Sequence, residues 1–304
     1  MNRLSKVVVV GASGQLGADI VTVLRDGFDV AGVDHAQVDI ERPSAVAAML
    51  VRFTPDLVIN TAAYHNVERC ETHAERAFAV NGVAVDSLAL ACALAGSALL
   101  HVSTDYVFDG DAQRPYGEAD RTRPRNVYGV SKLAGELLAA NRLERLWIVR
   151  TSGLYGSRGS STKGYTFIER IIAQARRNET VRVVDDVTFS PSYTVHVARA
   201  IRNIVTAAPF GTYHVTNAGS CTWHAFAAEV FAQLGLDPKF EATSSDAFPT
   251  YARRPRFSAL AHDAMEGAGL PAVPSWQDGI RAYLTSKSRG NPSGFGFTGE
   301  GRSP

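Results

Sequence analysis

Short runs of apolar residues alternate along the chain with longer segments in which apolar residues recur every three or four positions. The short runs predict strands and the periodic segments predict amphipathic helices. The strands are expected at 7–10, 28–33, 56–60, 98–103 and 146–150. The helices between and after them are expected at 15–26, 43–53, 73–95, 126–142 and 164–177. Nearly continuous apolar strands are typical of a parallel sheet buried on both faces, so the sequence predicts an α/β fold with a Rossmann-type doubly wound parallel sheet.

The alternation loosens after residue 151. The later segments predict strands at 181–184 and 211–216 and helices at 194–207, 222–235 and 275–285. We expect a dinucleotide-binding Rossmann domain over 1–151 with returning segments around 181–217. A small C-terminal substrate-binding lobe is expected from 152–180 and 218–284. The segment 285–304 is rich in Gly, Ser and Pro without apolar periodicity, so it is predicted to be disordered.

Composition narrows the class of protein. The chain has 304 residues and a formal net charge of +1, so neither a nucleic acid nor an anionic membrane is expected as a partner. The apolar run Val7–Val10 is too short for a signal peptide, and no apolar stretch reaches the length of a membrane span. Cys70, Cys92 and Cys221 lack metal-site spacing and are expected to be reduced. A cytoplasmic protein is predicted.

A glycine-rich turn follows the first strand and opens the first helix, in the stretch VVVVGASGQLGADI. Glycines let the backbone approach a pyrophosphate, and a helix N-terminus offers N–H groups and the positive end of a dipole. The spacing is G-x-x-G-x-x-G, and a merely structural turn is the alternative. Strand, turn and helix follow one another in the required order, which favours a dinucleotide site. The residues expected to bind the cofactor here are Gly11, Ser13, Gly14, Gln15, Leu16 and Gly17.

Further cofactor contacts are expected at the ends of the second and third strands. Asp34 stands where an acidic residue bonds the adenosine ribose 2′-hydroxyl, which favours NADH slightly over NADPH. Asp39 and Ile40 are placed to line the adenine, although a helix-start acid explains Asp39 equally well. After the third strand, Ala62, Ala63 and Tyr64 are expected beside the cofactor, because small residues allow a close approach.

The candidate reacting groups come from the fourth strand and the helix after it. Thr104 lies at the carboxyl end of the strand, where open α/β sheets collect ligands. Tyr128 and Lys132 are four residues apart and therefore share one helix face. Tyrosine can protonate the alkoxide left by hydride transfer to a ketone, and a neighbouring ammonium is expected to lower the phenol pKa. Lys132 can also hold the nicotinamide ribose.

A second pair has the same spacing. Tyr283 and Lys287 lie at the start of the predicted disordered tail. A frayed chain end does not hold a proton donor in place, so this pair is interpreted as solvated.

Several stretches together resemble the dTDP-4-dehydrorhamnose reductase family of extended short-chain dehydrogenases/reductases. They are GASGQLG, NTAAYHNVE, VSTDYVFDG, PYGEAD and YGVSKLAGE, and the similarity spans roughly 5–284. The resemblance implies reduction of dTDP-4-dehydro-L-rhamnose with NADPH or NADH. It also implies a small C-terminal lobe that holds the nucleotide sugar. The implied catalytic residues are Thr104, Tyr128 and Lys132. The implied substrate-binding residues are Val67, Thr104, Asp105, Tyr106, Phe108 and Gly153.

The chain departs from that family at three places. Gly153 replaces a tryptophan of the pattern R-T-S-W, so one wall of the sugar pocket is expected to differ. Gln15 occupies the position of a glutamate that binds Mg²⁺ at a dimer interface in some members, so no metal site is predicted and a homodimer is left open. The segment YHNVERCE is less acidic than its counterparts, which leaves the substrate's approach open as well.

Other activities on the same scaffold make different demands. A 4,6-dehydratase needs a carboxylate where this chain has Tyr106, which argues against dehydration. A nucleotide-sugar epimerase or reductase with tightly bound NAD stays open, since the same Thr, Tyr and Lys suit reversible oxidation. A regulatory or binding subunit resembling the methionine adenosyltransferase β-subunit is the non-enzymatic alternative. Intact Tyr128 and Lys132 weaken that alternative.

Overall fold

The main sheet has six strands, all parallel, in the order β10-β5-β4-β3-β1-β2. The computed structural model describes residues 4–158, 166–248 and 250–290. The strands are β1 (Lys6–Val10), β2 (Asp29–Val33), β3 (Leu57–Asn60), β4 (Ala98–Thr104), β5 (Leu146–Thr151) and β10 (Gly211–His214). The strand order reverses between β1 and β3, and loops that leave the carboxyl ends on either side of such a point enclose a crevice.

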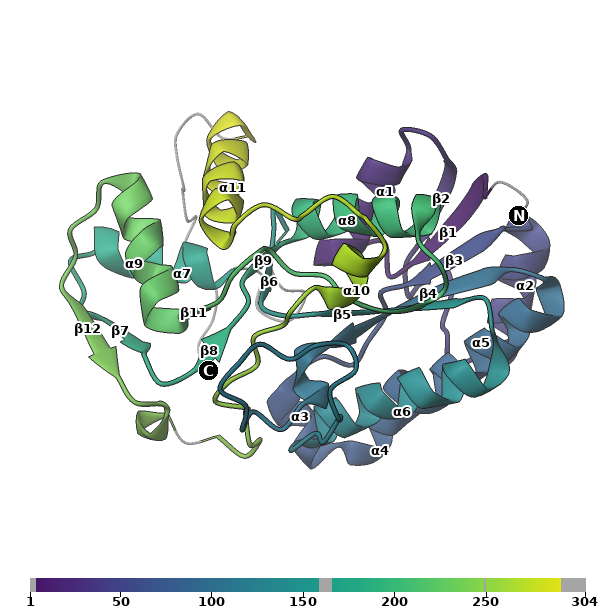
Figure 1. Cartoon of the computed structure of the whole chain (residues 1–304), viewed down its shortest axis with the longest axis horizontal. Helices are drawn as coiled ribbons and strands as arrows, with labels where there is room; N and C mark the ends of the chain where they lie inside the picture. Colours follow the sequence, from purple (N-terminus) through teal and green to yellow (C-terminus); the bar gives the residue numbers. More distant parts are fainter. Residues whose placement is uncertain (1–3, 159–165, 249, 291–304) are drawn as a thin grey trace.

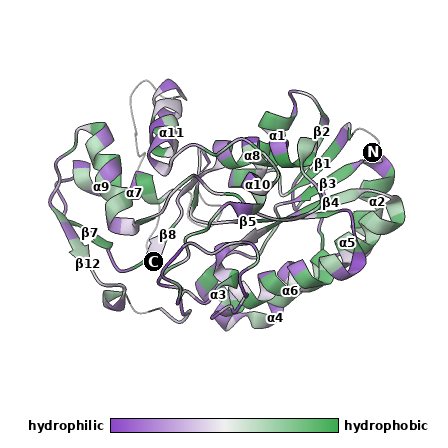
Figure 2. Cartoon of the chain, viewed as in Figure 1, coloured by the Kyte–Doolittle hydropathy of each residue, from purple (hydrophilic) through white to green (hydrophobic). Residues whose placement is uncertain are grey.

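Helices cover both faces of this sheet (Figure 1). On one face lie α1 (Gln15–Leu24), α8 (Thr194–Ala207) and α10 (Asp263–Gly267). On the other lie α2 (Pro43–Phe53), α5 (Ala84–Ala95) and α6 (Val127–Arg142). The strands between them are coloured largely as hydrophobic in Figure 2, as expected for a sheet buried on both sides. The predicted doubly wound Rossmann-type fold is confirmed.

The helix predicted over 73–95 is divided. It consists of α4 (Ala74–Phe78), the π-helical segment η1 (Ala79–Val83) and α5, and it is preceded by α3 (Val67–Thr72). The extra residue of a π turn aims Asn81 inward, where its amide bonds the backbone of Tyr64 and the hydroxyl of Ser131. Within the described residues, Ala74–Ala95 is the one helix long and apolar enough to cross a membrane, and half of its most apolar window is buried inside the fold.

A second hydrophobic core lies beside the sheet. It contains α7 (Phe167–Arg176), α9 (Trp223–Leu234), α11 (Trp276–Gly290) and the paired strands β7 (Val181–Val184) and β12 (Phe240–Thr243). The expected return of the chain to the main sheet around 181–217 is therefore wrong at its beginning, because β7 pairs with β12. α8 and β10 do return. Short ladders at the junction join β6 (Leu154–Tyr155) to β9 (Ser192–Tyr193) and β8 (Thr188–Phe189) to β11 (Cys221–Thr222).

The predicted disorder from residue 285 is wrong for the first part of that segment. α11 continues to Gly290, and the rest of the predicted tail, 291–304, lies outside the described residues. Tyr283 is fully buried in the second core, and Lys287 forms an ion pair with Glu169 of α7 at 2.7 Å. The interpretation of Tyr283 and Lys287 as a solvated pair is wrong as well. The helix is anchored by buried Tyr283 and Leu284, and beyond them Lys287 bonds Glu169 and the carbonyl oxygen of Ser157. These are contacts between distant segments, which the polar sequence after Leu284 does not reveal.

Candidate active site

A cavity of about 740 Å³ opens at the carboxyl ends of the sheet strands, between the sheet and the second core. Its walls come from the loops after β1, β2, β3, β4 and β5 and from the β8 and α9 region. All predicted site residues line it except Asp34 and Phe108. Those that do are Gly11, Ser13, Gly14, Gln15, Leu16, Gly17, Asp39, Ile40, Ala62, Ala63, Tyr64, Val67, Thr104, Asp105, Tyr106, Tyr128, Lys132 and Gly153.

One end of the cavity is the glycine turn between β1 and α1. Gly11 has φ +80°, a left-handed conformation that favours glycine. A Cβ on Gly17 would lie 2.3 Å from the carbonyl oxygen of Gly11, so the turn closes only with glycine there. Gly14 is the N-cap of α1 and supplies no side-chain cap. The helix N-terminus therefore presents backbone to the cavity, as an anion site requires.

The end near β2 differs from expectation at Asp34. Its carboxylate accepts a hydrogen bond from the backbone N–H of Gln37 and does not line the cavity, because the turn after β2 folds back on itself. Residues that the sequence analysis did not select line this end instead, namely His35, Glu41 and Arg76. Arg76 forms an ion pair with Glu41. A basic group from α4 thus stands beside an acid where we expected an acid alone.

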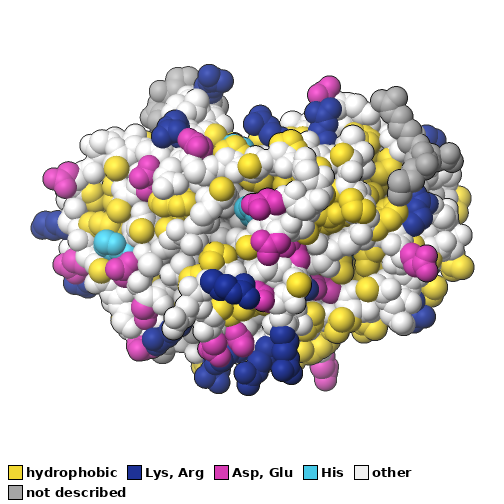
Figure 3. Space-filling model, in the orientation of Figure 1, with side chains coloured by type: hydrophobic (Ala, Val, Ile, Leu, Met, Phe, Trp, Pro, Cys, Tyr) yellow, Lys and Arg dark blue, Asp and Glu magenta, His cyan; other side chains and the backbone are white. Residues whose placement is uncertain are grey.

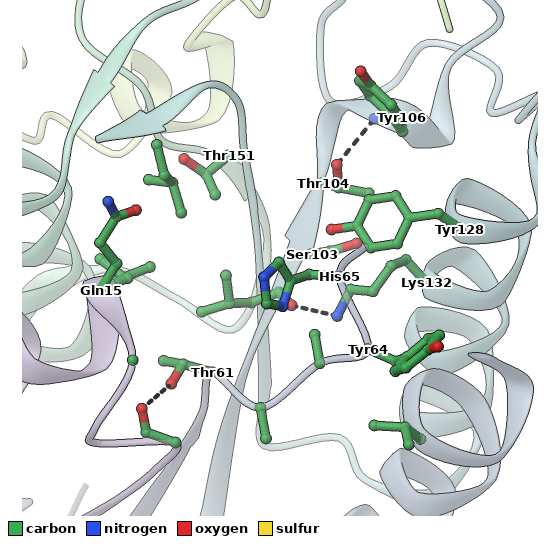
Figure 4. A pocket seen from close by; sticks show the side chains of 18 of the residues that line it. Gln15, Thr61, Tyr64, His65, Ser103, Thr104, Tyr106, Tyr128, Lys132 and Thr151 are labelled. Carbon is green, nitrogen blue, oxygen red and sulfur yellow. Dashed lines mark hydrogen bonds between the residues drawn. The ribbon is translucent and has the colours of Figure 1, made fainter. Parts of the chain in front are cut away.

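Tyr128 and Lys132 reach the cavity from the first two turns of α6. The Asn126 side chain caps that helix by accepting from the N–H of Gly129, which starts the helix immediately before Tyr128. Thr104, Tyr128 and Lys132 lie together on one side of the cavity, opposite Gln15 (Figure 4). The structure therefore brings together the three side chains that the sequence analysis grouped.

Lys132 is almost completely buried, and its contacts differ from the expected ones. Its Nζ lies 2.7 Å from the carbonyl oxygen of Val102 and 3.1 Å from Nε2 of His101. Burial lowers the pKa of Lys132 to about 8. Burial also raises the pKa of the Tyr128 phenol, which a hydrogen bond with Thr104 opposes. The expectation that Lys132 makes Tyr128 more acidic is wrong for this structure, since desolvation dominates and the ammonium is directed to β4.

Thr104 belongs to a buried group of hydroxyls around Asp105. Its Oγ1 donates to Asp105 Oδ1 at 3.0 Å and accepts from the N–H of Tyr106 at 3.2 Å, at the start of the 3₁₀ turn η2 (Asp105–Val107). Ser152 donates to the other carboxylate oxygen at 2.8 Å. Burial raises the pKa of Asp105, while hydrogen bonds from Ser258, Ser152 and Thr104 lower it. The Asp105 carboxylate therefore fixes the orientation of the Thr104 hydroxyl.

An aromatic pair stands beside Gly153. Gly153 has φ +52°, and a Cβ there would lie 2.4 Å from the ring of Phe189. Phe189 stacks on Trp223 with ring centroids 3.9 Å apart, and both line the cavity. The predicted difference in the wall at Gly153 is thus an aromatic surface supplied from another part of the chain.

Phe108 was expected at the cavity but is fully buried elsewhere. Its ring stacks on Tyr116, with ring centroids 4.3 Å apart, in a small separate core. The turn η2 changes the chain direction after Thr104, so Thr104, Asp105 and Tyr106 line the cavity and Phe108 does not.

Sequence reasoning missed a further set of cavity residues: Thr151, Ser152, Val187, Phe189, Trp223, Pro255 and Ser258. Ser103, which the sequence places with Thr104 at the carboxyl end of a strand, lines the cavity as well, and the same strand-end signal was available for Thr151 and Ser152 after β5. The others belong to the irregular second half of the chain, where no local pattern marks them. Over the described residues, no group of three or more His, Cys, Asp or Glu side chains could hold a metal ion.

Comparisons with known proteins agree on one family. The family model described as "RmlD substrate binding domain" matches residues 5–289. A spore coat polysaccharide biosynthesis protein of Bacillus subtilis, SpsK, is 34% identical over 286 residues, covering 94% of this chain and 99% of that protein. A dTDP-4-dehydrorhamnose reductase of Streptomyces griseus is 39% identical, covering 91% of each chain.

Solved structures give the same result. A dTDP-4-dehydrorhamnose reductase of Bacillus anthracis, in complex with NADP, superimposes with a TM-score of 0.88 at 32% identity, covering 93% of this chain and all of that one. The family resemblance read from the sequence motifs is thereby confirmed. This chain belongs to the RmlD substrate binding domain family, among the relatives of dTDP-4-dehydrorhamnose reductase.

Proposed function

We propose that the protein reduces a nucleotide-linked 4-keto-6-deoxy sugar with NADPH or NADH, converting dTDP-4-dehydro-L-rhamnose to dTDP-L-rhamnose. The observation that carries the proposal is the grouping of Thr104, Tyr128 and Lys132 in a cavity whose other end is a glycine turn at a helix N-terminus. The name of the Streptomyces griseus relative and the NADP in the Bacillus anthracis structure support the same reaction and cofactor.

The residues present fit a nicotinamide dinucleotide. Gly17 packs on the carbonyl of Gly11 and so lets the glycine turn close at the N-terminus of α1, the kind of end at which a pyrophosphate binds. Ser103 and Thr151 line the cavity, and their buried hydroxyl oxygens have no hydrogen-bond partner among the described residues. A reduced nicotinamide bound at this site supplies the hydride. Lys132 and Tyr64 lie where its ribose would be held, and Arg76 stands near the adenosine end.

The protein supplies the proton and the orientation of the carbonyl. Reduction adds a hydride to the carbonyl carbon and a proton to its oxygen. Because burial raises the pKa of Tyr128, the phenol is protonated at neutral pH and can donate to the nascent alkoxide. Lys132, with a pKa of about 8, carries a positive charge at that pH and is proposed to hold the nicotinamide ribose. Thr104 is proposed to orient the carbonyl oxygen, for which its hydroxyl hydrogen turns from Asp105 Oδ1 to the substrate.

The sugar is proposed to lie against the second core, with Phe189 and Trp223 as its aromatic wall. Apolar faces of sugars pack on aromatic rings, and this stack stands where Gly153 leaves room. Val67, Tyr106 and Gly153 also line the cavity. The proposed cytoplasmic location follows from the soluble nucleotide-sugar substrate.

The function is tested by incubating the purified protein with a panel of dTDP- and UDP-linked 4-keto sugars and each coenzyme. With dTDP-4-dehydrorhamnose, the absorbance of the reduced nicotinamide is expected to fall in proportion to the substrate added, and dTDP-rhamnose is expected as the product. Folded protein that oxidises no coenzyme with any member of the panel would contradict the proposal. Product formation by retained NAD, without net coenzyme consumption, would instead indicate an epimerase.

A homodimer is proposed through the outer faces of α5 and α6. Leu94 and Leu137 on these helices are 82% and 63% exposed. On the face drawn in Figure 3, lysine and arginine side chains are mixed with acidic ones, so charge alone does not mark an interface there. Leu137→Glu is expected to shift the protein from dimer to monomer in light scattering. Tyr251→Glu, at an exposed position of the other lobe, is the control. Equal masses for wild type and Leu137→Glu would contradict this interface.

A further inference from the structure

A chain of three buried polar side chains ends at the amine of Lys132. His101 lies on β4 and Asn60 at the end of β3, and both are fully buried. Lys132 Nζ is 3.1 Å from His101 Nε2, and His101 Nδ1 is 3.2 Å from Asn60 Nδ2. The second hydrogen bond of Lys132 goes to the carbonyl oxygen of Val102. Groups buried at this depth exchange few hydrogen bonds with water, so their donors and acceptors must match one another.

The backbone fixes the direction of this chain. The N–H of Ala62 donates to Asn60 Oδ1 at 3.1 Å, so the amide nitrogen of Asn60 must face His101. An amide nitrogen only donates, and His101 Nδ1 must therefore accept. Burial lowers the pKa of His101 well below its usual value, so the ring is neutral and carries its one hydrogen on Nε2. That hydrogen points at Lys132 Nζ.

An amine and an ammonium respond differently to such a donor. A neutral amine accepts from Nε2–H with its lone pair and still donates to Val102. An ammonium has three donors and no lone pair, so it faces the Nε2–H donor to donor. If His101 carried its hydrogen on Nδ1 instead, that hydrogen would face the amide nitrogen of Asn60, which is also a donor. If the Asn60 amide were flipped as well, its nitrogen would face the N–H of Ala62, again donor to donor. Protonation of Lys132 thus leaves one buried hydrogen bond of the chain unmade.

We propose that His101 is a positioning residue whose tautomer, fixed by Asn60, opposes protonation of Lys132 and thereby sets the pH at which the site loses its positive charge. The chain is not a proton path, because it ends at the Asn60 amide against the backbone of Ala62. The consequence for turnover rests on the proposed reductase function. The tautomer and the lysine titration do not depend on it.

The charged surroundings of Lys132 agree with this role. Burial lowers its pKa, and the Glu136 carboxylate one turn along α6 raises it. Glu136 is itself held in an ion pair by Arg150 of β5, at 2.7 Å. The ionisable groups on the elements nearby that act on Tyr128 are Asp105 and Tyr106 of η2 and Cys70 of α3. On β4, His101 is the ionisable group within hydrogen-bond distance of Lys132 Nζ.

The tautomer is tested by long-range ¹H–¹⁵N NMR of the histidine rings at a pH about two units above the Lys132 pKa of about 8, where the lysine is an amine. His101, assigned by comparison with His101→Gln, is expected to carry its hydrogen on Nε2. A hydrogen on Nδ1 would overturn the proposal, because Nε2 would then accept from Lys132 in both states. This result is independent of any activity.

The titration is tested by ¹³C NMR of the lysine side chains, of which the chain has five. In His101→Gln, the side-chain oxygen can accept from an ammonium, so the Lys132 pKa is expected to rise by about one unit or more. Asn60→Asp should act in the same direction, since a carboxylate accepts from Nδ1–H and frees Nε2 as an acceptor. An unchanged or lower Lys132 pKa in His101→Gln would overturn the proposal.

Activity gives a separate readout. The wild-type rate is expected to fall as pH rises through the Lys132 pKa, and this alkaline limb should move to higher pH in His101→Gln and Asn60→Asp. Ser131→Ala is the matched control, because Ser131 is buried beside Lys132 but bonds Asn81 and the Tyr128 carbonyl. Its limb should stay in place. A protein with the expected NMR results but no reductase activity would refute the proposed function alone.

Discussion

Replacing Tyr128 with phenylalanine is expected to lower kcat for keto-sugar reduction by a factor of about 10²–10⁴, the range that a positioned general acid contributes. The reason is that the phenol is the protonated group beside Thr104 in the cavity, kept protonated at neutral pH by burial. NADPH affinity should change little, because the variant loses one hydroxyl and keeps the ring. Steady-state kinetics with dTDP-4-dehydrorhamnose and a fluorescence titration with NADPH measure the two quantities.

Two control variants separate this effect from general damage. Tyr283→Phe changes a buried tyrosine with the same four-residue spacing to a lysine, but in α11 and away from the cavity, so kcat should be unchanged. Tyr106→Phe changes a phenol that lines the same cavity, and it is expected to raise KM rather than lower kcat. Wild-type turnover by Tyr128→Phe would remove Tyr128 as the proton donor.

The sheet and its helices could be predicted because their signals are local. Apolar runs marked β1, β3 and β4 to within one or two residues, and the helix expected over 126–142 matches α6 closely. Parallel strands carry their carboxyl ends to one edge, so Thr104 and the glycine turn had to meet at one cavity. These inferences needed only the order of the elements.

The remaining features depended on contacts between distant segments. Phe189 and Trp223 reach the cavity because β8 pairs with β11, a pairing of two-residue strands that leaves no periodic signal. Asn81 points inward because of a π turn inside an otherwise regular helix. The contact of Lys132 with His101 depends on how deeply α6 packs on β4. Desolvation at that depth explains why the expected acidification of Tyr128 was wrong.

The motif that carries Tyr128 and Lys132 also contains Glu136, which forms a buried ion pair that stabilises the fold. Glu136 is one turn beyond Lys132, is 3% exposed, and binds Arg150 of β5 through two guanidinium nitrogens. Arg150 is itself only 7% exposed by its side chain and also lies over the ring of Phe108. This ion pair joins α6 to the sheet directly below the reacting groups.

Replacing Glu136 with glutamine is expected to lower the free energy of unfolding by about 3–5 kcal/mol, because it leaves the buried guanidinium of Arg150 without a counter-charge. Urea denaturation followed by circular dichroism measures the change. Glu241→Gln is the matched control, since the Arg182–Glu241 pair is exposed and should contribute less than about 1 kcal/mol. The double variant Glu136→Leu/Arg150→Met should recover most of the loss, because apolar side chains of similar size can replace a buried ion pair at little cost. If the double variant were as unstable as Glu136→Gln, the loss would come from packing, and the uncompensated charge would not be its cause.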